Sequence, residues 1–203
     1  MIMRPKGRFC YQGNIMIKTV GIDEVGRGCW AGPLLVVAAQ AKAELPPGLK
    51  DSKELTTKQR ELLAPEIETV CKIGEGWVQP EEIDELGLTK AMQLGVVRAL
   101  LTLGVQEDVE IIMDGHINYC PEEYSKVVTV IGADKKYPIV SAASIYAKVK
   151  RDAHMKRAAQ LYPNYGFEKH VGYGTELHRL MLKNYGPSRI HRYSYKPVQS
   201  YAI

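Results

Sequence analysis

Residues 20–28 read VGIDEVGRG, an apolar run followed by two adjacent carboxylates and then by an arginine between two glycines. The apolar residues predict a short strand over residues 17–23. Asp23 and Glu24 stand at its end, and a buried carboxylate is costly unless it is paired, hydrogen-bonded or bound to a metal ion. Adjacent residues of a regular strand point to opposite faces, so these two carboxylates share a site only where the chain bends. The glycines at positions 26 and 28 make such a bend feasible.

Two further apolar runs end in a carboxylate, Asp114 after residues 111–113 and Asp134 after residues 130–133. Three such strand ends in a small domain predict that the carboxylates converge. Converging like charges raise one another's pKa, and a divalent cation relieves that repulsion. Hard oxygen ligands favour Mg²⁺ or Mn²⁺, and two such ions about 4 Å apart serve phosphodiester hydrolysis. The alternative is that each aspartate simply ends a strand and caps a turn, as Asp114-Gly115 suggests.

The rest of the chain predicts strands that pair first and then alternate with helices. We expect strands at residues 34–43, 71–78, 109–113 and 126–131, and helices from Thr56 or Thr57 to 70, from Pro80, from Thr89 to 103, over 138–161 and over 174–184. This order suits an α/β fold with a mixed sheet flanked by helices. Neither GxGxxG nor GxxxxGK[ST] is present. Residues 1–16 are expected to form a loose N-terminal extension, and residues 17–203 a single domain.

Composition and charge narrow the class of protein. The chain has 203 residues, of which 45% are hydrophobic and 25% charged, as in ordinary globular domains. No apolar h-region or membrane-length apolar run is evident, so we expect a cytoplasmic protein without a membrane partner. The four cysteines (Cys10, Cys29, Cys71 and Cys120) form no CxxC motif, which favours reduced thiols over a zinc site.

The charges are unevenly distributed along the chain. Residues 44–123 hold 17 acidic and 7 basic residues, whereas residues 124–203 hold 4 acidic and 14 basic residues. This asymmetry predicts a face that meets a polyanion, with a solvated basic tail as the alternative.

Several residues fit contacts to phosphate and sugar. The 26–28 loop (Gly26, Arg27 and Gly28) could approach a ribose 2′-OH, the group that distinguishes RNA from DNA. Ser52 and Lys53 could contact a phosphate, and Lys148 shares a helix face with Arg151. Tyr173 lies between two glycines, where an exposed ring could stack on a sugar or base. The alternatives are a flexible turn, a plain surface loop, a solvated helix and a tyrosine packed on the core. His178 is interpreted as a structural residue or as one that supports a residue of the site.

Taken in order, these motifs resemble the ribonuclease HII family. The resemblance begins at residues 21–28 with Ala31-Gly32-Pro33 and continues through 51–53, 114–115 and 133–134. It extends through Ser141-Ala142-Ala143-Ser144-Ile145, residues 147–149, 151–152 and 172–175, His178 and His191-Arg192. It covers roughly residues 18–197, in the family's order.

The resemblance implies a ribonuclease H-like fold with a C-terminal helical substrate-binding segment. It implies an endonuclease that cuts the RNA strand of RNA–DNA hybrids and incises 5′ to single ribonucleotides embedded in duplex DNA. The residues matching the family's four acidic metal ligands are Asp23, Glu24, Asp114 and Asp134, for Mn²⁺ or Mg²⁺. The residues matching its substrate contacts are Gly26, Arg27 and Gly28 at the 2′-OH, Ser52 and Lys53 at a phosphate, Lys148 in the helix motif, and Tyr173 on the deoxyribose after the ribonucleotide.

Some positions depart from the family pattern, and two other functions stay open. Cys29-Trp30 replaces a proline and a small or aliphatic residue, Val171 replaces a common lysine, and residues 1–16 match nothing useful. From the length we expect no extra N-terminal domain of the kind that type III enzymes carry, which favours type II. The alternatives are another metal-dependent nuclease of the same fold, which would ignore the 2′-OH, and a non-catalytic nucleic-acid-binding module. We expect a monomer that binds RNA–DNA hybrids and ribonucleotide-containing DNA duplexes.

Overall fold

The computed structural model, which describes residues 19–49 and 54–201, is built around a five-stranded mixed sheet. The strands are β1 (Val20–Val25), β2 (Leu34–Ala41), β3 (Cys71–Val78), β4 (Ile111–Asp114) and β5 (Val127–Val130). Their order is β3-β2-β1-β4-β5, with β1, β2 and β3 antiparallel and β1, β4 and β5 parallel. The predicted mixed sheet is confirmed. The 1–16 extension lies outside the described residues.

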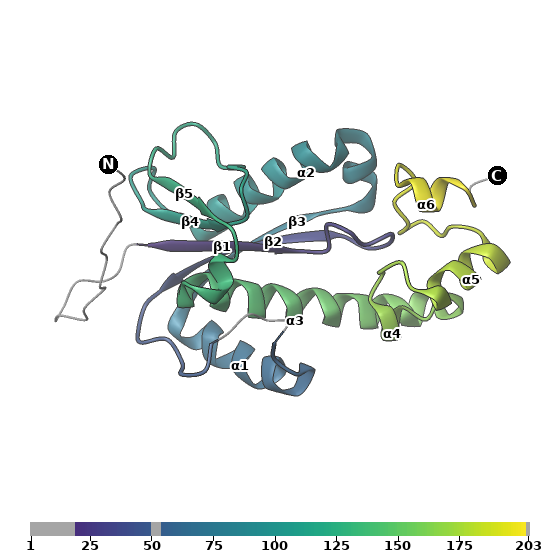
Figure 1. Cartoon of the computed structure of the whole chain (residues 1–203), viewed down its shortest axis with the longest axis horizontal. Helices are drawn as coiled ribbons and strands as arrows, with labels where there is room; N and C mark the ends of the chain where they lie inside the picture. Colours follow the sequence, from purple (N-terminus) through teal and green to yellow (C-terminus); the bar gives the residue numbers. More distant parts are fainter. Residues whose placement is uncertain (1–18, 50–53, 202–203) are drawn as a thin grey trace, which may run out of the picture.

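Helices cover both faces of this sheet (Figure 1). Helix α2 (Pro80–Leu103) lies on one face, and α1 (Thr57–Val70) and α3 (Pro138–Leu161) lie on the other. Alternate residues of β2 therefore enter two different cores. Leu34 and Val36 pack in the core that includes α2, whereas Leu35 and Val37 pack in the core that includes α1 and α3. Burial on both sides explains why this strand reads as a continuous apolar run.

Helix α2 joins the two helices that the sequence predicts there. Gly87 has non-helical angles (φ 73°, ψ 159°) and marks the kink between them. Beyond the kink the helix packs closely on β3, since a Cβ atom on Gly76 would lie 1.8 Å from the Gly95 carbonyl oxygen. By length and composition alone α2 could cross a membrane, but its buried residues pack on the sheet as those of a core helix do.

The C-terminal region forms a small helical segment at the far end of α3 (Figure 1). It contains α4 (Phe167–His170), α5 (Glu176–Tyr185) and α6 (Lys196–Gln199), with a 3-10 turn at Pro163–Tyr165. A third core holds it together around Phe167, with Met155 from α3 and Leu182 from α5. The predicted helix over 174–184 begins at Glu176 because the Thr175 hydroxyl caps it, accepting from the His178 N–H at 3.3 Å. The short α4 and α6 were not predicted.

Candidate active site

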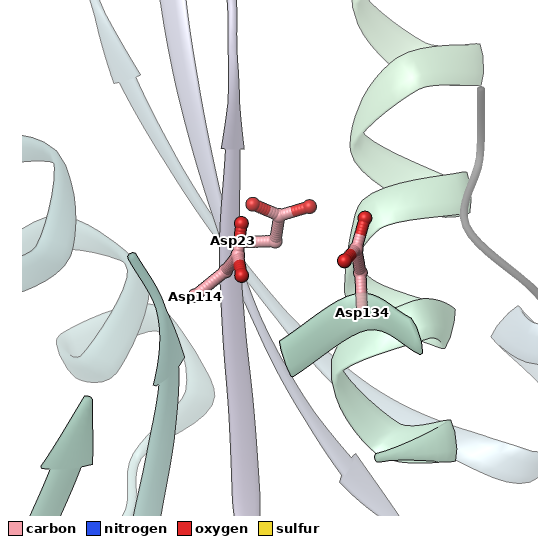
Figure 2. Close-up of side chains that lie close together, drawn as sticks. All are labelled: Asp23, Asp114 and Asp134. Atoms are coloured by element: carbon pink, nitrogen blue, oxygen red, sulfur yellow. The ribbon is translucent and has the colours of Figure 1, made fainter. Parts of the chain in front are cut away.

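Three aspartates from separate segments converge at one edge of the sheet. One carboxylate oxygen from each of Asp23, Asp114 and Asp134 lies within 4.8 Å of the others. Figure 2 shows their side chains pointing toward a common space, with the start of α3 beside Asp134. Asp23 and Asp134 are buried, and Asp114 is half-buried. The predicted convergence of these strand ends is confirmed for these three residues.

The sheet register and one turn place the three carboxylates. Asp23 pairs with Val37, and cross-strand partners share a face, so Asp23 lies on the α3 side of the sheet. Asp114 ends β4, which runs parallel beside β1. Its Oδ1 accepts a hydrogen bond of 2.7 Å from the Ala133 N–H. Gly132, at φ 67°, starts the 3-10 turn Ala133–Lys135, whose second residue is Asp134.

Electrostatics marks this cluster as a cation site. Burial raises the pKa of Asp23 well above its usual value, and the charges of Glu24 and Asp114 raise it further. Hydrogen bonds from the Ser144 side chain and the Glu24 N–H oppose that rise without cancelling it. Three hard oxygen donors held this close fit a Mg²⁺ or Mn²⁺ cofactor, which neutralises the repulsion among them.

Glu24, the fourth predicted acidic ligand, is not part of this group of three aspartates. The bend considered between Asp23 and Glu24 is absent, because β1 keeps regular register with β2 through Val25. The Glu24 carboxylate instead lies 3.2 Å from Nη1 of Arg27, while remaining close enough to raise the pKa of Asp23. The role of Glu24 as a metal ligand stays a prediction.

The 26–28 loop follows directly and turns sharply. Gly26 has a φ of 97°, and a Cβ atom there would lie 2.4 Å from Nε of Arg151 and 2.9 Å from the Pro33 carbonyl oxygen. Position 26 therefore requires glycine both for its positive φ and because a side chain would clash with Arg151 and Pro33. Gly28 is exposed, and no described atom lies within 4 Å of the position of a Cβ atom on it. A ligand can thus approach the loop at Gly28.

Two fully buried arginines brace this loop and the segment after it. Arg151, in α3, donates to the carbonyls of Pro33, Val171 and Ala31 at 2.8, 2.8 and 3.1 Å. Arg192 donates to the carbonyls of Gly32 and Arg27 at 2.9–3.1 Å. Sequence reasoning missed this role: Arg151 was interpreted by its helix face alone.

Tyr173 and Lys148 lie together beside the loop. Tyr173 is 39% exposed, and the Lys148 ammonium lies 5.5 Å from its ring centroid. The Tyr173 hydroxyl and the Cys29 thiol interact, which places the ring next to the end of the loop. Lys148 is one helical turn beyond Ser144, the residue that hydrogen-bonds Asp23. Helix α3 therefore carries one residue that contacts the acidic cluster (Ser144) and, one turn later, one that contacts Tyr173 (Lys148).

A chain of buried histidines supports Tyr173 from behind. The His178 Nδ1 donates to the Tyr173 carbonyl at 2.9 Å, and the His178 Nε2 lies 2.9 Å from the His191 Nε2. The Ser188 N–H donates to the His191 Nδ1, so each ring in this chain is neutral. Burial lowers the pKa of His178 to about 4 and of His191 to about 3. The structural interpretation of His178 agrees with this arrangement.

The structure describes the departures at Val171 and Trp30, whereas the predicted contacts at Ser52 and Lys53 lie outside the described residues. Val171 has a φ of 45°, a left-handed conformation, and its carbonyl accepts from Arg151. Trp30 packs over Gly174, where a Cβ atom would lie 2.2 Å from the indole ring. The departure at Trp30 is therefore accommodated by a glycine beside Tyr173.

Known proteins share this sequence and arrangement. A family model described as Ribonuclease HII matches residues 20–198. A Ribonuclease HII from Streptomyces avermitilis is 44% identical over 177 residues, covering 86% of this chain and 75% of the relative. A chain of the PCNA:RNase HII complex from Archaeoglobus fulgidus matches at a TM-score of 0.73 and 30% identity, over 90% of this chain and 96% of that chain. The ribonuclease H2 from Pyrococcus horikoshii matches at 0.72 and 29%, with the same coverage. The chain therefore belongs to the ribonuclease HII family, and it is an endonuclease of the ribonuclease H class, a hydrolase acting on RNA in RNA–DNA hybrids.

Proposed function

We propose that this ribonuclease incises duplex DNA on the 5′ side of a single embedded ribonucleotide, and that Asp23, Glu24, Asp114 and Asp134 hold two Mg²⁺ or Mn²⁺ ions for the reaction. The observation that carries the proposal is the meeting of three buried or half-buried aspartates directly beside an open glycine loop. A binding module gains nothing from this arrangement, because carboxylates facing a phosphate backbone repel it.

The chain's own groups divide the work of hydrolysis. When bound, the two ions activate the attacking water and stabilise the leaving oxygen. Asp23, fixed by the Ser144 side chain and the Glu24 N–H, offers a rigid oxygen donor at the centre of the cluster. The Ala133 N–H fixes Asp114 in the same way. Such fixed donors need no rearrangement as charge develops on the phosphate.

Recognition of the ribonucleotide is assigned to the exposed side of the 26–28 loop and to Tyr173. Gly28 is exposed and has open space where a side chain would stand, so a ribose can approach its backbone and place the 2′-oxygen near the N–H. The half-exposed Tyr173 ring offers a face on which the next deoxyribose stacks. Lys148 lies beside that ring, with its ammonium 2.8 Å from Asp152 Oδ1, and is assigned to the phosphate backbone of the substrate. A ribonucleotide at Gly28 followed by a deoxyribonucleotide at Tyr173 therefore fits these two contacts.

We also propose that one chain suffices for activity. The three aspartates, the 26–28 loop and Tyr173 all come from the same chain and pack through one set of cores. Gel filtration with light scattering tests this, and a dimer that loses activity on dilution contradicts it.

The decisive experiment is cleavage of a 5′-labelled DNA duplex that contains one ribonucleotide, in Mg²⁺, Mn²⁺ or EDTA. An all-DNA duplex of the same sequence is the matched control. We expect a metal-dependent cut on the 5′ side of the ribonucleotide and none in the control duplex.

Other outcomes separate the alternatives. Equal cutting of both duplexes contradicts ribose recognition and favours a general nuclease of this fold. Tight, salt-sensitive binding without a cut in either metal contradicts the enzyme mechanism and favours a binding module. Loss of cleavage in Asp23→Asn without loss of folding is expected if the carboxylates act as metal ligands.

A further inference from the structure

The carbonyl of Arg27, in the middle of the 26–28 loop, is held from the opposite end of the chain. Nη1 of Arg192 donates to it at 3.0 Å, and the Tyr195 hydroxyl donates to it at 2.6 Å. The same Arg192 nitrogen also donates to the Tyr195 hydroxyl oxygen at 2.9 Å. Arg192 is fully buried, so the carbonyl points into the protein. Three groups thus form one closed hydrogen-bonded triangle.

This triangle fixes the direction of a group on the outer side of the loop. In a planar trans peptide the N–H of one residue points away from the carbonyl of the residue before it. No described peptide bond is cis. Because the Arg27 carbonyl points inward to Arg192 and Tyr195, the Gly28 N–H points outward. Gly28 is exposed there, with open space where a side chain would stand.

We infer that Tyr195, together with Arg192, is a positioning residue for ribose recognition: it locks the Arg27–Gly28 peptide so that the Gly28 N–H faces the 2′-oxygen of the substrate. This inference rests on the proposed role of the 26–28 loop. Rotation of that peptide would turn a carbonyl oxygen toward the ribose in place of a donor. The triangle therefore acts on selectivity for the 2′-OH and leaves contacts to the phosphate backbone unchanged.

Tyr195→Phe tests the contact with little other change. The ring stays, and with it the packing of Tyr195 against the α2-side core and the Arg192 guanidinium 5.2 Å from the ring centroid. The Arg192 bond to the Arg27 carbonyl also stays. Tyr193→Phe is the matched control, because its hydroxyl donates at 3.3 Å to the Pro187 carbonyl, away from the loop.

The measurement is the Kd of the full-length protein for two fluorescent DNA duplexes by anisotropy in EDTA, so that neither is cut. One duplex contains a single ribonucleotide, and the other is all DNA. Repulsion by the acidic cluster is common to both and cancels in the ratio of the two Kd values. Tyr195→Phe is expected to reduce the preference for the ribonucleotide by about 2- to 10-fold, the loss of one neutral hydrogen bond's effect. Its Kd for all-DNA duplex and the preference of Tyr193→Phe are expected to match wild type.

The outcomes separate this inference from the proposed function beneath it. If wild type prefers the ribonucleotide and Tyr195→Phe keeps the whole preference, the role of Tyr195 is wrong while the loop's role stands. Equal weakening on both duplexes shows a merely structural role and also overturns the inference. If wild type shows no preference, the proposed ribose recognition fails, and the inference fails with it.

Discussion

Replacing Asp23 with asparagine is expected to stabilise the metal-free protein while removing its activity. One carboxylate oxygen of Asp23 lies within 4.8 Å of an oxygen of Asp114 and of an oxygen of Asp134. Two unit charges at that distance repel by about 3 kcal/mol at an effective dielectric constant of about 20. Proton uptake by the cluster relieves part of this, because the pKa of Asp23 is raised. We therefore expect a net gain of about 1–3 kcal/mol, or about 2–12 °C in Tm for a chain of this length.

The gain has a defined dependence on pH. An aspartate whose pKa is raised by folding binds more protons in the folded state, so it costs stability as pH rises above its ordinary pKa. The advantage of Asp23→Asn is therefore expected to be full above the raised pKa and to disappear toward about pH 4, the ordinary range of aspartate. Thermal unfolding in EDTA between pH 4 and pH 8 measures it. Asp108→Asn, an exposed turn aspartate, is the matched control.

Adding metal should narrow or reverse the difference in stability between the two proteins. Mn²⁺ at 100 times its Kd stabilises a protein by about 2.7 kcal/mol, and the variant lacks one of the ligands. Cleavage of the ribonucleotide-containing duplex is expected to fall by more than about 100-fold, since loss of a group that only supports a metal ligand already costs about 10- to 100-fold. A variant that unfolds below wild type in EDTA, or that gains equally from Mn²⁺, would refute the reasoning and make Asp23 a structural carboxylate.

Three other changes test the surroundings of the site. Gly26→Ala is expected to cost about 1–3 kcal/mol, because it combines a positive φ with a clash against Arg151, and urea unfolding measures the loss. Tyr173→Ala is expected to lower cleavage at a single ribonucleotide by about 10- to 100-fold at unchanged Tm, and an unchanged rate would contradict its stacking role. His178 and His191 have pKa values lowered to about 4 and 3, so the unfolded chain binds more protons below about pH 6.5. Urea titrations of Asp23→Asn remove the opposite pH dependence of Asp23. In that variant the free energy of unfolding should fall as pH drops from 6.5 to 5, by up to about 1.4 kcal/mol per unit for each histidine, and a flat profile would contradict buried neutral rings.

The residues that sequence reasoning placed correctly share one property: local pattern suffices for them. Asp114 and Asp134 follow apolar runs, and parallel strand ends meet at one edge of a sheet. The helix at Thr57–Val70 was predicted because Thr56 caps it, as the structure shows with a full capping box. The break in α2 was predicted as two helices, which agrees with the kink at Gly87.

The residues that it missed depend on contacts between distant parts of the chain. The regular register of β1 past Asp23 comes from pairing with β2, so the position of Glu24 relative to the aspartates could not be read from Gly26 and Gly28. The inward carbonyls that bind Arg151 and Arg192 exist only after the C-terminal segment returns to the loop. Every residue has a backbone carbonyl, so the residue type does not show which carbonyls accept a hydrogen bond. The sequence likewise does not distinguish a buried arginine from an exposed one.

The hydrogen bonds from Arg192 and Tyr195 to Arg27 join residues 165 and 168 positions apart. A ribosome adding about 5–20 residues per second needs about 8–33 s to make that stretch. Asp134, the last of the three aspartates to be synthesised, precedes Arg192 in the chain, so all three carboxylates are made before the brace of the 26–28 loop. The nascent protein thus acquires its charge cluster first and the hydrogen bonds that hold the Arg27 carbonyl last. A chain that ends before residue 192 would lack both donors to the Arg27 carbonyl, and with them the restraint that we propose for the Gly28 N–H.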